Sequence, residues 1–215
     1  IVVWGWRRVQ RQRENNSIDF FKGNAGRLRE QQELIVPWAD YSEITLQLLD
    51  RLETKKFDLI IEVGVGEGRL LPYLGDRARR VTALDLSKDM LRLAQQHAQH
   101  LSNVSFVHGS TDALKKHSHE VDVIVANMVL HHTPEPEKVL AEAASLLMPG
   151  GHFIVSELCA HDQAWAREHC GDVWLGFTPE QLAGWAEGAD LTLSASVFLA
   201  QRNGFQIQVQ HFQRC

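Results

Sequence analysis

The chain has 215 residues, of which 44% are hydrophobic, and a formal net charge of −5. This length suits one α/β domain whose core needs neither metals nor disulfides. The mild charge argues against a nucleic-acid-binding surface spread over the whole domain. The cysteines, Cys159, Cys170 and Cys215, have no metal-ligand spacing, and they favour free thiols in a reducing cytoplasm.

The N-terminal segment begins with apolar residues and continues with a cluster of arginines. Residues 1–6 are apolar but too few to span a membrane, and they lack the pattern of a signal peptide. The arginines that follow favour a solvated helix face or linker over a nucleic-acid contact. Because the first residue is not methionine, a longer parent protein stays open. We expect residues 1–16 to be a linker helix or the remnant of an upstream domain, and residues 17–215 to form the main domain.

Two helices are predicted next. Residues Ser17–Leu34 carry apolar residues at helical spacing, with Ser17 as N-cap. Pro37 opens a second helix with a buried stripe at Ile44, Leu48, Leu49 and Leu52. We expect the helices within residues 17–55 to form part of the cover of a binding site.

From Phe57 onward, short apolar strands alternate with helices. The predicted strands are 57–63, 81–85, 104–107, 121–126, 152–158, 191–201 and 205–213, and helices are predicted at 88–100 and 136–147. This alternation indicates a parallel sheet covered on both faces. Asn203-Gly204 predicts a hairpin with a type I′ turn. The predicted fold is therefore an α/β, Rossmann-like three-layer sandwich whose seven-stranded, mostly parallel sheet ends in an antiparallel C-terminal hairpin.

A glycine-rich turn follows the first strand of this sheet. It reads Gly64-Val65-Gly66-Glu67-Gly68, whereas a dinucleotide site wants its third glycine at the position of Arg69. Glu62 would oppose a pyrophosphate but would suit an ammonium group, and Asp85 ends the next strand where a carboxylate binds ribose hydroxyls. Ribose without pyrophosphate, plus an amino acid moiety, describes S-adenosylmethionine. A tight turn without a ligand is the alternative.

The stretch from Glu62 to Gly151 resembles the core of class I S-adenosylmethionine-dependent methyltransferases. The resemblance implies that Gly64, Gly66 and Gly68 line the methionine part of the cofactor and that Asp85 takes the ribose hydroxyls. The string Asp85-Leu86-Ser87-Lys88-Asp89-Met90 is similar to the family's D-x-S-x-x-M pattern. It implies that Leu86 and Met90 pack beside adenine, although Met90 is equally compatible with a core position.

Two further loops belong to this resemblance. Ser110 stands where related enzymes often carry an acid for the adenine amino group, so Thr111 or Asp112 would substitute, unless Asp112 is a helix N-cap. Asn127 is expected beside the cofactor's methionine group. His131 and His132 follow, and either could act as a general base or be a hydrogen-bonded loop residue. We predict no metal site, because no third ligand with sensible spacing lies near them in the sequence.

The segment 161–177 is rich in aromatic and charged residues and follows the fifth strand. It resembles methyltransferase domains fused behind winged-helix regulators of the arsenic-repressor type, through Asp162, Arg167-Glu168 and Leu175-Gly176-Phe177. The resemblance places a DNA-binding half upstream. We expect Trp165, Trp174 and His131 to contact a small organic acceptor, unless the aromatic residues only cap the sheet. In that case the acceptor would lie near Phe21 and Tyr41.

The sequence therefore predicts a cytoplasmic methyltransferase that uses S-adenosylmethionine, releases S-adenosylhomocysteine and acts on an unidentified small molecule. One alternative is a module that senses either compound for a transcriptional regulator. Another is a nicotinamide-dependent oxidoreductase, which Glu62 and Arg69 disfavour. We expect no membrane partner, and nucleic acid only through an upstream domain; a homodimer stays open.

Overall fold

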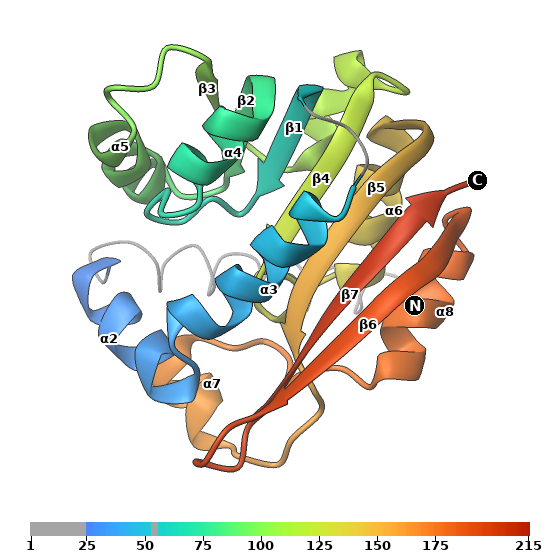
Figure 1. The fold of residues 1–215 in the computed structure, drawn as a ribbon. Coiled ribbons are helices and arrows are strands. Elements are labelled where there is room, and N and C mark those ends of the chain that lie inside the picture. Colours follow the sequence, from blue (N-terminus) through green and yellow to red (C-terminus); the bar gives the residue numbers. More distant parts are fainter. Residues whose placement is uncertain (1–24, 53–55) are drawn as a thin grey trace, which may run out of the picture.

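The computed structural model describes residues 25–52 and 56–215. Within these residues, seven strands form one sheet in the order β3-β2-β1-β4-β5-β7-β6 (Figure 1). The strands are β1 Phe57–Val63, β2 Ala78–Asp85, β3 Val104–His108, β4 Val121–Asn127, β5 Leu147–Leu158, β6 Leu191–Ala200 and β7 Gln206–Arg214. The helices are α2 Ala25–Ile35, α3 Trp38–Asp50, α4 Leu71–Arg77, α5 Lys88–His97, η1 Thr111–His117, η2 Leu130–His132, α6 Pro136–Leu146, α7 Trp165–Cys170 and α8 Pro179–Glu187.

The strand directions confirm the predicted sheet. β1 pairs in parallel with β2 and β4, β2 with β3, and β4 with β5. β7 is antiparallel to both β5 and β6 and lies between them. The turns that follow β1, β2, β3 and β4 therefore leave the same edge of the sheet, where an open α/β sheet binds its ligands.

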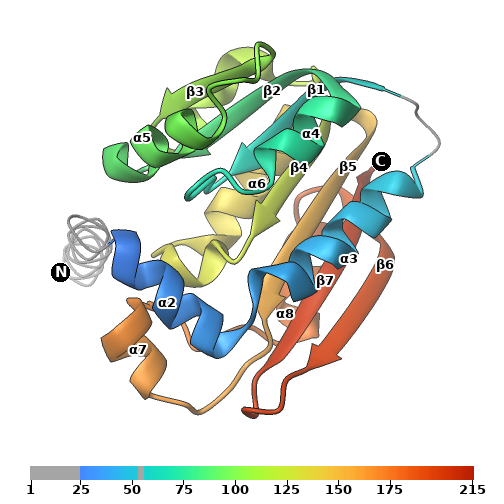
Figure 2. The same ribbon diagram turned by 60° about the vertical axis from the view of Figure 1, so that its left-hand side comes forward.

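Helices cover both faces of the sheet, as Figure 2 shows from the side. Neighbouring strand residues serve opposite layers: Ile60 packs in the core with α3, α4 and α5, and Ile61 packs in the core with α6 and α8. Both side chains are fully buried. A strand that is buried on both faces has to be apolar throughout, which is why these strands read as continuous hydrophobic runs.

The C-terminal hairpin is confirmed, but its predicted turn type is wrong. Of the two turn residues, Gly204 alone has a positive φ, 88°. The Gly204 amide bonds the Gln201 carbonyl, which makes Arg202 and Asn203 the central turn residues. The Asn203 side chain donates to the carbonyls of Leu34 and Ile35, and this anchor to α2 holds it out of the left-handed conformation.

Several boundaries also differ from the prediction. β5 begins at Leu147, five residues early, because the chain is already extended opposite Val121 before the Pro149-Gly150-Gly151 segment. Pro37 precedes α3 as its N-cap residue. The predictions for residues 1–16, Ser17 and Phe21 lie outside the described residues. Among the described helices, none is both long and apolar enough to cross a bilayer.

Candidate functional site

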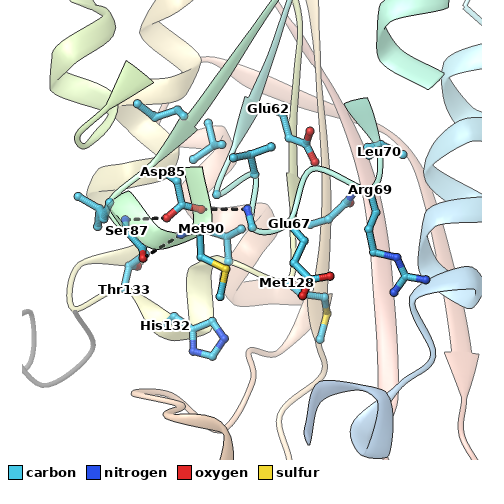
Figure 3. Close-up of a pocket in the computed structure, with 18 of the residues that line it drawn as sticks. Glu62, Glu67, Arg69, Leu70, Asp85, Ser87, Met90, Met128, His132 and Thr133 are labelled. Atoms are coloured by element: carbon cyan, nitrogen blue, oxygen red, sulfur yellow. Dashed lines mark hydrogen bonds between the residues drawn. The ribbon is translucent and has the colours of Figure 1, made fainter. Parts of the chain in front are cut away.

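A cavity lies at the carboxyl edge of the sheet. Its walls are the turns after β1, β2, β3 and β4, together with Gln32 from α2, Val36 from the link to α3, and Trp38 and Tyr41 from α3. Figure 3 shows Glu62 and Asp85 along one part of this cavity and His132 along another. The helices expected to cover the site, as far as they are described, therefore do line it.

The three glycines of the turn after β1 have different surroundings. Gly64, Gly66 and Gly68 have φ values of 69°, 54° and 76°, which side chains rarely adopt. A Cβ on Gly64 would lie 2.4 Å from Val129 Cγ2, whereas a Cβ on Gly66 would meet no atom within 4 Å. Gly64 thus allows close packing of the turn, and Gly66 exposes backbone to the cavity.

Glu62 is a buried acid with an unused hydrogen-bonding atom. It is the penultimate residue of β1 and lines the cavity, and its Oε2 has no hydrogen-bond partner among the described residues. Burial, with the nearby charge of Asp85, raises the pKa of Glu62 to about 8. An ammonium group from a ligand would supply the missing partner and stabilise the ionised form.

Asp85 ends β2 and is held by backbone amides. Its Oδ2 accepts from Gly66 N at 2.9 Å and its Oδ1 accepts from Ser87 N at 2.8 Å (Figure 3). Burial raises the pKa of Asp85, and these hydrogen bonds oppose the rise. Since a carboxylate can accept about four hydrogen bonds, Asp85 retains capacity for two ligand hydroxyls.

The residues expected around adenine also line the cavity. Leu86 is 47% exposed there, whereas Met90 is buried at the start of α5. Ser110 and Thr111 lie on the cavity wall, and the Thr111 hydroxyl donates to Glu142. Asp112 pairs with Lys115 on the surface, so it is neither an adenine ligand nor the N-cap, a position that Ser110 holds.

Asn127 ends β4 on the cavity wall with a defined amide orientation. Ser156 Oγ donates to Asn127 Oδ1 at 2.8 Å, and Thr45 Oγ1 approaches the same oxygen at 3.1 Å. Because hydroxyl donors meet the oxygen, the amide nitrogen is left to donate toward a ligand.

The two histidines after β4 have separate environments. His132 lines the cavity, while His131 lies behind it and is 1% exposed. His131 Nδ1 donates to Glu157 Oε2 at 2.6 Å, and Glu157 Oε1 accepts from the amides of Val129 and Leu130. His131 was predicted to contact an acceptor, but its side chain lies behind the cavity wall and is bonded to Glu157.

The charges around this pair set their protonation. Burial lowers the pKa of His131, but the carboxylates of Glu157 and Asp172 outweigh it and raise the value to about 9. Burial and the charge of His131 hold the pKa of His132 well below its ordinary value. His132 is thus a neutral imidazole at pH 7.

Asp172 is a third potential metal ligand beside the two histidines, which the prediction of no metal site did not consider. Its carboxylate lies near both histidines, and the three side chains form a group whose ligand atoms lie within 4.8 Å of one another. The third ligand comes from the segment after α7, forty residues away along the chain (172 against 132), so no local spacing could have shown it.

Helix α3 adds two aromatic residues to the cavity wall: Tyr41, which was predicted near a possible acceptor, and Trp38, which was not. The Arg69 guanidinium lies 4.4 Å from the centre of the Trp38 ring. Arg69 also pairs with Glu33 at 2.8 Å. Burial raises the pKa of Tyr41. Trp38 is the first residue of α3, which was predicted as an amphipathic helix, and nothing in the sequence pattern indicated that its side chain would face a ligand.

Trp165 and Trp174 are both absent from the cavity wall. Trp165 packs against Phe205 in one core, and Trp174 packs against Phe177 in the core on the other face of the sheet. The indole nitrogen of Trp174 donates to the Thr133 carbonyl at 2.8 Å. Their arrangement matches the alternative in which these aromatic residues only cap the sheet.

Comparison with known proteins places this geometry in context. Residues 61–155 match the family model described as "Methyltransferase domain". The ubiquinone biosynthesis O-methyltransferase of Coxiella burnetii is 26% identical over 164 residues, covering 70% of each chain. That of Serratia proteamaculans is 26% identical over 147 residues, covering 61% of each.

Solved structures share the fold at low identity. Magnesium protoporphyrin IX methyltransferase from Synechocystis, solved with bound S-adenosylmethionine, is 17% identical with a TM-score of 0.72, over 92% of this chain and 95% of that one. The N-methyltransferase NodS from Bradyrhizobium japonicum, in complex with S-adenosylhomocysteine, is 21% identical with a TM-score of 0.65, over 87% and 98%. The names of these two proteins give different substrates and their sequence identities are low, so the comparison supports the fold alone.

Proposed function

Because this chain is an S-adenosylmethionine-dependent methyltransferase, we propose that it methylates a hydroxyl oxygen of a small planar organic acceptor. One observation carries the proposal: a single cavity is lined by the carboxylates of Glu62 and Asp85, by aromatic side chains and by a neutral imidazole. We assign the carboxylates to a cofactor end, and Trp38, Tyr41 and His132 to an acceptor end. The O-methyltransferase names of the relatives from Coxiella and Serratia support an oxygen acceptor.

The first end suits the cofactor group by group. Glu62 would bind the ammonium, Asp85 the ribose hydroxyls, and the Gly64, Gly66 and Gly68 backbone the methionine chain. The remaining contacts would come from the other cavity residues expected there, Leu86, Met90, Ser110, Thr111 and Asn127. The fit rests on the orphaned Glu62 Oε2, on the spare lone pairs of Asp85 and on the open space beside Gly66.

The second end suits an acceptor that is flat and carries an oxygen. The Trp38 and Tyr41 rings offer faces for burial, and Arg69 adds a cation beside them. His132 is the member of the histidine pair that would meet the acceptor oxygen, since His131 is tied to Glu157. Of the two histidines predicted as catalytic, we therefore propose that His132 is the catalytic residue.

When bound, the cofactor supplies a methyl group on a positively charged sulfur, which is already activated for transfer. The chain's own residues then have to align the acceptor oxygen with that methyl and keep water out. Asn127 and Tyr41 offer hydrogen bonds that orient the reactants, and His132 offers a neutral ring nitrogen to the hydroxyl as its proton is lost.

Methyl transfer from a labelled donor tests this proposal. The chain is incubated with methyl-labelled S-adenosylmethionine and a matched panel of phenols, anilines and thiols, with Asp85→Ala as the control. We expect label to pass to phenols and Asp85→Ala to lose most turnover at subsaturating cofactor. Label on anilines or thiols alone would overturn the oxygen acceptor. Tight binding of S-adenosylhomocysteine without turnover on any acceptor would favour the sensing module.

The finer features of the resemblance remain proposals. We propose that the chain is the methyltransferase half of a cytoplasmic winged-helix regulator, on the strength of residues 161–177. In this arrangement residues 1–16 are the connection to the upstream domain and any nucleic-acid contact lies there. The coding sequence upstream of residue 1 tests this directly, and light scattering tests whether the chain is a homodimer.

A further inference from the structure

A compact group of potential metal ligands lies directly behind the cavity wall. His131 and His132 come from η2, and Asp172 comes from the segment after α7. Asp172 Oδ1 lies 3.8 Å from His131 Nε2 and 3.7 Å from His132 Nδ1. All three side chains are buried. We call these three residues the His-His-Asp cluster.

Asp172 has no hydrogen-bond partner among the described residues that accounts for its burial. Its side chain is fully buried, and neither carboxylate oxygen makes a hydrogen bond to any described residue. At 3.7–3.8 Å the histidine nitrogens are too far away for hydrogen bonds. A buried carboxylate without partners costs several kcal/mol unless a cation joins it. The His131 ring at 3.8 Å is an ion-pair partner without a hydrogen bond, and a metal ion among the three ligand atoms would contact all of them directly.

The surroundings of His131 match those of a metal ligand. Its Nδ1 donates to Glu157 Oε2 at 2.6 Å, so its Nε2 is directed at the cluster. Metal-bound histidines usually donate their other nitrogen to a carboxylate in this way, which sets the ring orientation and raises its basicity. Glu157 is itself held by the amides of Val129 and Leu130.

Backbone hydrogen bonds hold the third ligand in place before any metal arrives. The amides of Val173 and Trp174 both donate to the His131 carbonyl, at 2.9 and 3.0 Å. Gly171, with φ 73°, ends α7 and turns the chain toward His131. The two segments that carry the ligands are thus joined directly after Asp172.

We propose that the His-His-Asp cluster binds a divalent transition metal of the zinc class. Two imidazole nitrogens and one carboxylate oxygen are a donor set that zinc and its neighbours prefer, and three protein ligands leave a fourth position for water or another oxygen. Tetrahedral zinc with bonds of about 2.0–2.1 Å places its ligand atoms about 3.3 Å apart. The two spacings of 3.7–3.8 Å to Asp172 therefore need to close by a few tenths of an ångström, and all three ligand atoms already lie within 4.8 Å of one another.

Such a metal would give the Asp172 carboxylate a partner and would also fix the position of His132. It would join η2 to the segment after α7 and hold His132 on the cavity wall through its Nδ1. With Nδ1 on the metal, the neutral ring of His132 carries its hydrogen on Nε2, which lies 3.4 Å from Gln32 Nε2. In the metal-bound state His132 would therefore donate a hydrogen bond to the acceptor oxygen, and the proton of the hydroxyl would pass to water. The metal would thus determine the position of the residue that meets the acceptor.

Metal titration of the chelator-treated protein tests the site. We expect one Zn²⁺ per chain by calorimetry, and Co²⁺ to give visible absorption bands of a low-symmetry site. Asp172→Asn keeps the side-chain shape and removes the buried charge, so it should fold and should weaken Zn²⁺ binding at least 100-fold. His131→Gln is a second variant with the same expected loss.

A second histidine pair provides the matched control. His152 Nδ1 and His211 Nε2 lie 3.0 Å apart on β5 and β7, far along the chain from the cluster. His152→Gln should leave zinc affinity unchanged. Equal zinc affinity in wild type and Asp172→Asn, or a loss caused by His152→Gln alone, would overturn the proposal.

The outcome is separate from that of the proposed function. Calorimetry with S-adenosylhomocysteine on the metal-free protein reports on Glu62 and Asp85, which lie outside the cluster. Zinc binding without binding of S-adenosylhomocysteine would leave the metal site standing and count against the cofactor contacts. The reverse result would remove the metal and leave the methyltransferase site intact.

Discussion

The cofactor end that we propose for the cavity and the proposed acceptor end are assembled in different ways. At the cofactor end, Glu62 comes from β1, Gly66 from the turn after β1, and Asp85 from β2. The backbone amides of Gly66 and Ser87 hold the Asp85 carboxylate. At the acceptor end, Tyr41 comes from α3 and His132 from η2, and Asp172 behind them comes from a third segment.

The two ends differ in the interactions that fix the positions of their residues. The cofactor end uses strand ends that the parallel sheet already brings together, so short motifs describe it. The acceptor end depends on long-range contacts, above all the bond between His131 and Glu157 and those from residues 173 and 174 to the His131 carbonyl. Substitutions at the two ends should therefore separate stability from cofactor affinity.

The largest expected effect is on stability at the acceptor end. Glu157→Gln should lower the free energy of unfolding by about 3–5 kcal/mol, because it leaves the buried charge of His131 without its partner. Urea unfolding at pH 7 in the presence of a chelator measures this. Glu43→Gln, an exposed change on α3, should stay within about 0.5 kcal/mol. A loss below about 1 kcal/mol for Glu157→Gln would show that the pair does not organise this end.

The next effect concerns the buried acid of the cofactor end. The pKa of Glu62 is about 8 in the folded chain, above its ordinary value of 4.5. Folding therefore prefers the protonated acid, and stability should fall as pH rises from about 4.5 to 8. Glu62→Gln should abolish that part of the fall and be more stable than wild type at pH 9 by about 2–4 kcal/mol.

The same substitution should weaken the cofactor end while it stabilises the fold. Without the carboxylate, the ammonium of S-adenosylhomocysteine loses a charged partner worth about 1.5–3 kcal/mol. Thermal unfolding from pH 5 to 9 and calorimetry at pH 8 measure the two effects. Parallel pH curves for wild type and Glu62→Gln would show that this acid does not titrate within the range.

The two ends also differ in how far sequence reasoning reached. The strand pattern and the turn after β1 predicted the sheet and the cavity residues Glu62, Gly66 and Asp85, because these are local features of an α/β fold. Trp165 and Trp174 were assigned to an acceptor from composition, yet they pack in separate cores on opposite faces of the sheet. Asp172 was missed because its meeting with His131 depends on bonds across forty residues, which no spacing encodes.

A smaller loss is expected from Asp85→Ala. This residue lies at a strand end, so the fold should persist while the affinity for S-adenosylhomocysteine falls by about 1.5–3 kcal/mol, since charge-assisted bonds to ribose are lost. Calorimetry with S-adenosylhomocysteine on wild type and Asp85→Ala measures this difference in affinity. Asp85→Asn, which keeps an acceptor for the Gly66 amide, should lose less, and equal affinities in all three proteins would remove Asp85 from the site.

The smallest effect separates acceptor from cofactor. Tyr41 lies on the cavity wall, and its raised pKa keeps the hydroxyl protonated throughout the working range. Tyr41→Phe removes one neutral hydrogen-bond donor, worth about 0.5–1.5 kcal/mol, which corresponds to roughly a 2–10-fold change. We expect this as a higher KM for the acceptor, with the affinity for S-adenosylhomocysteine unchanged, because Glu62 and Asp85 are untouched. Steady-state kinetics with a phenolic acceptor and calorimetry on the same preparation measure both. Weaker S-adenosylhomocysteine binding with an unchanged acceptor KM would move Tyr41 to the cofactor end and remove the division between the two.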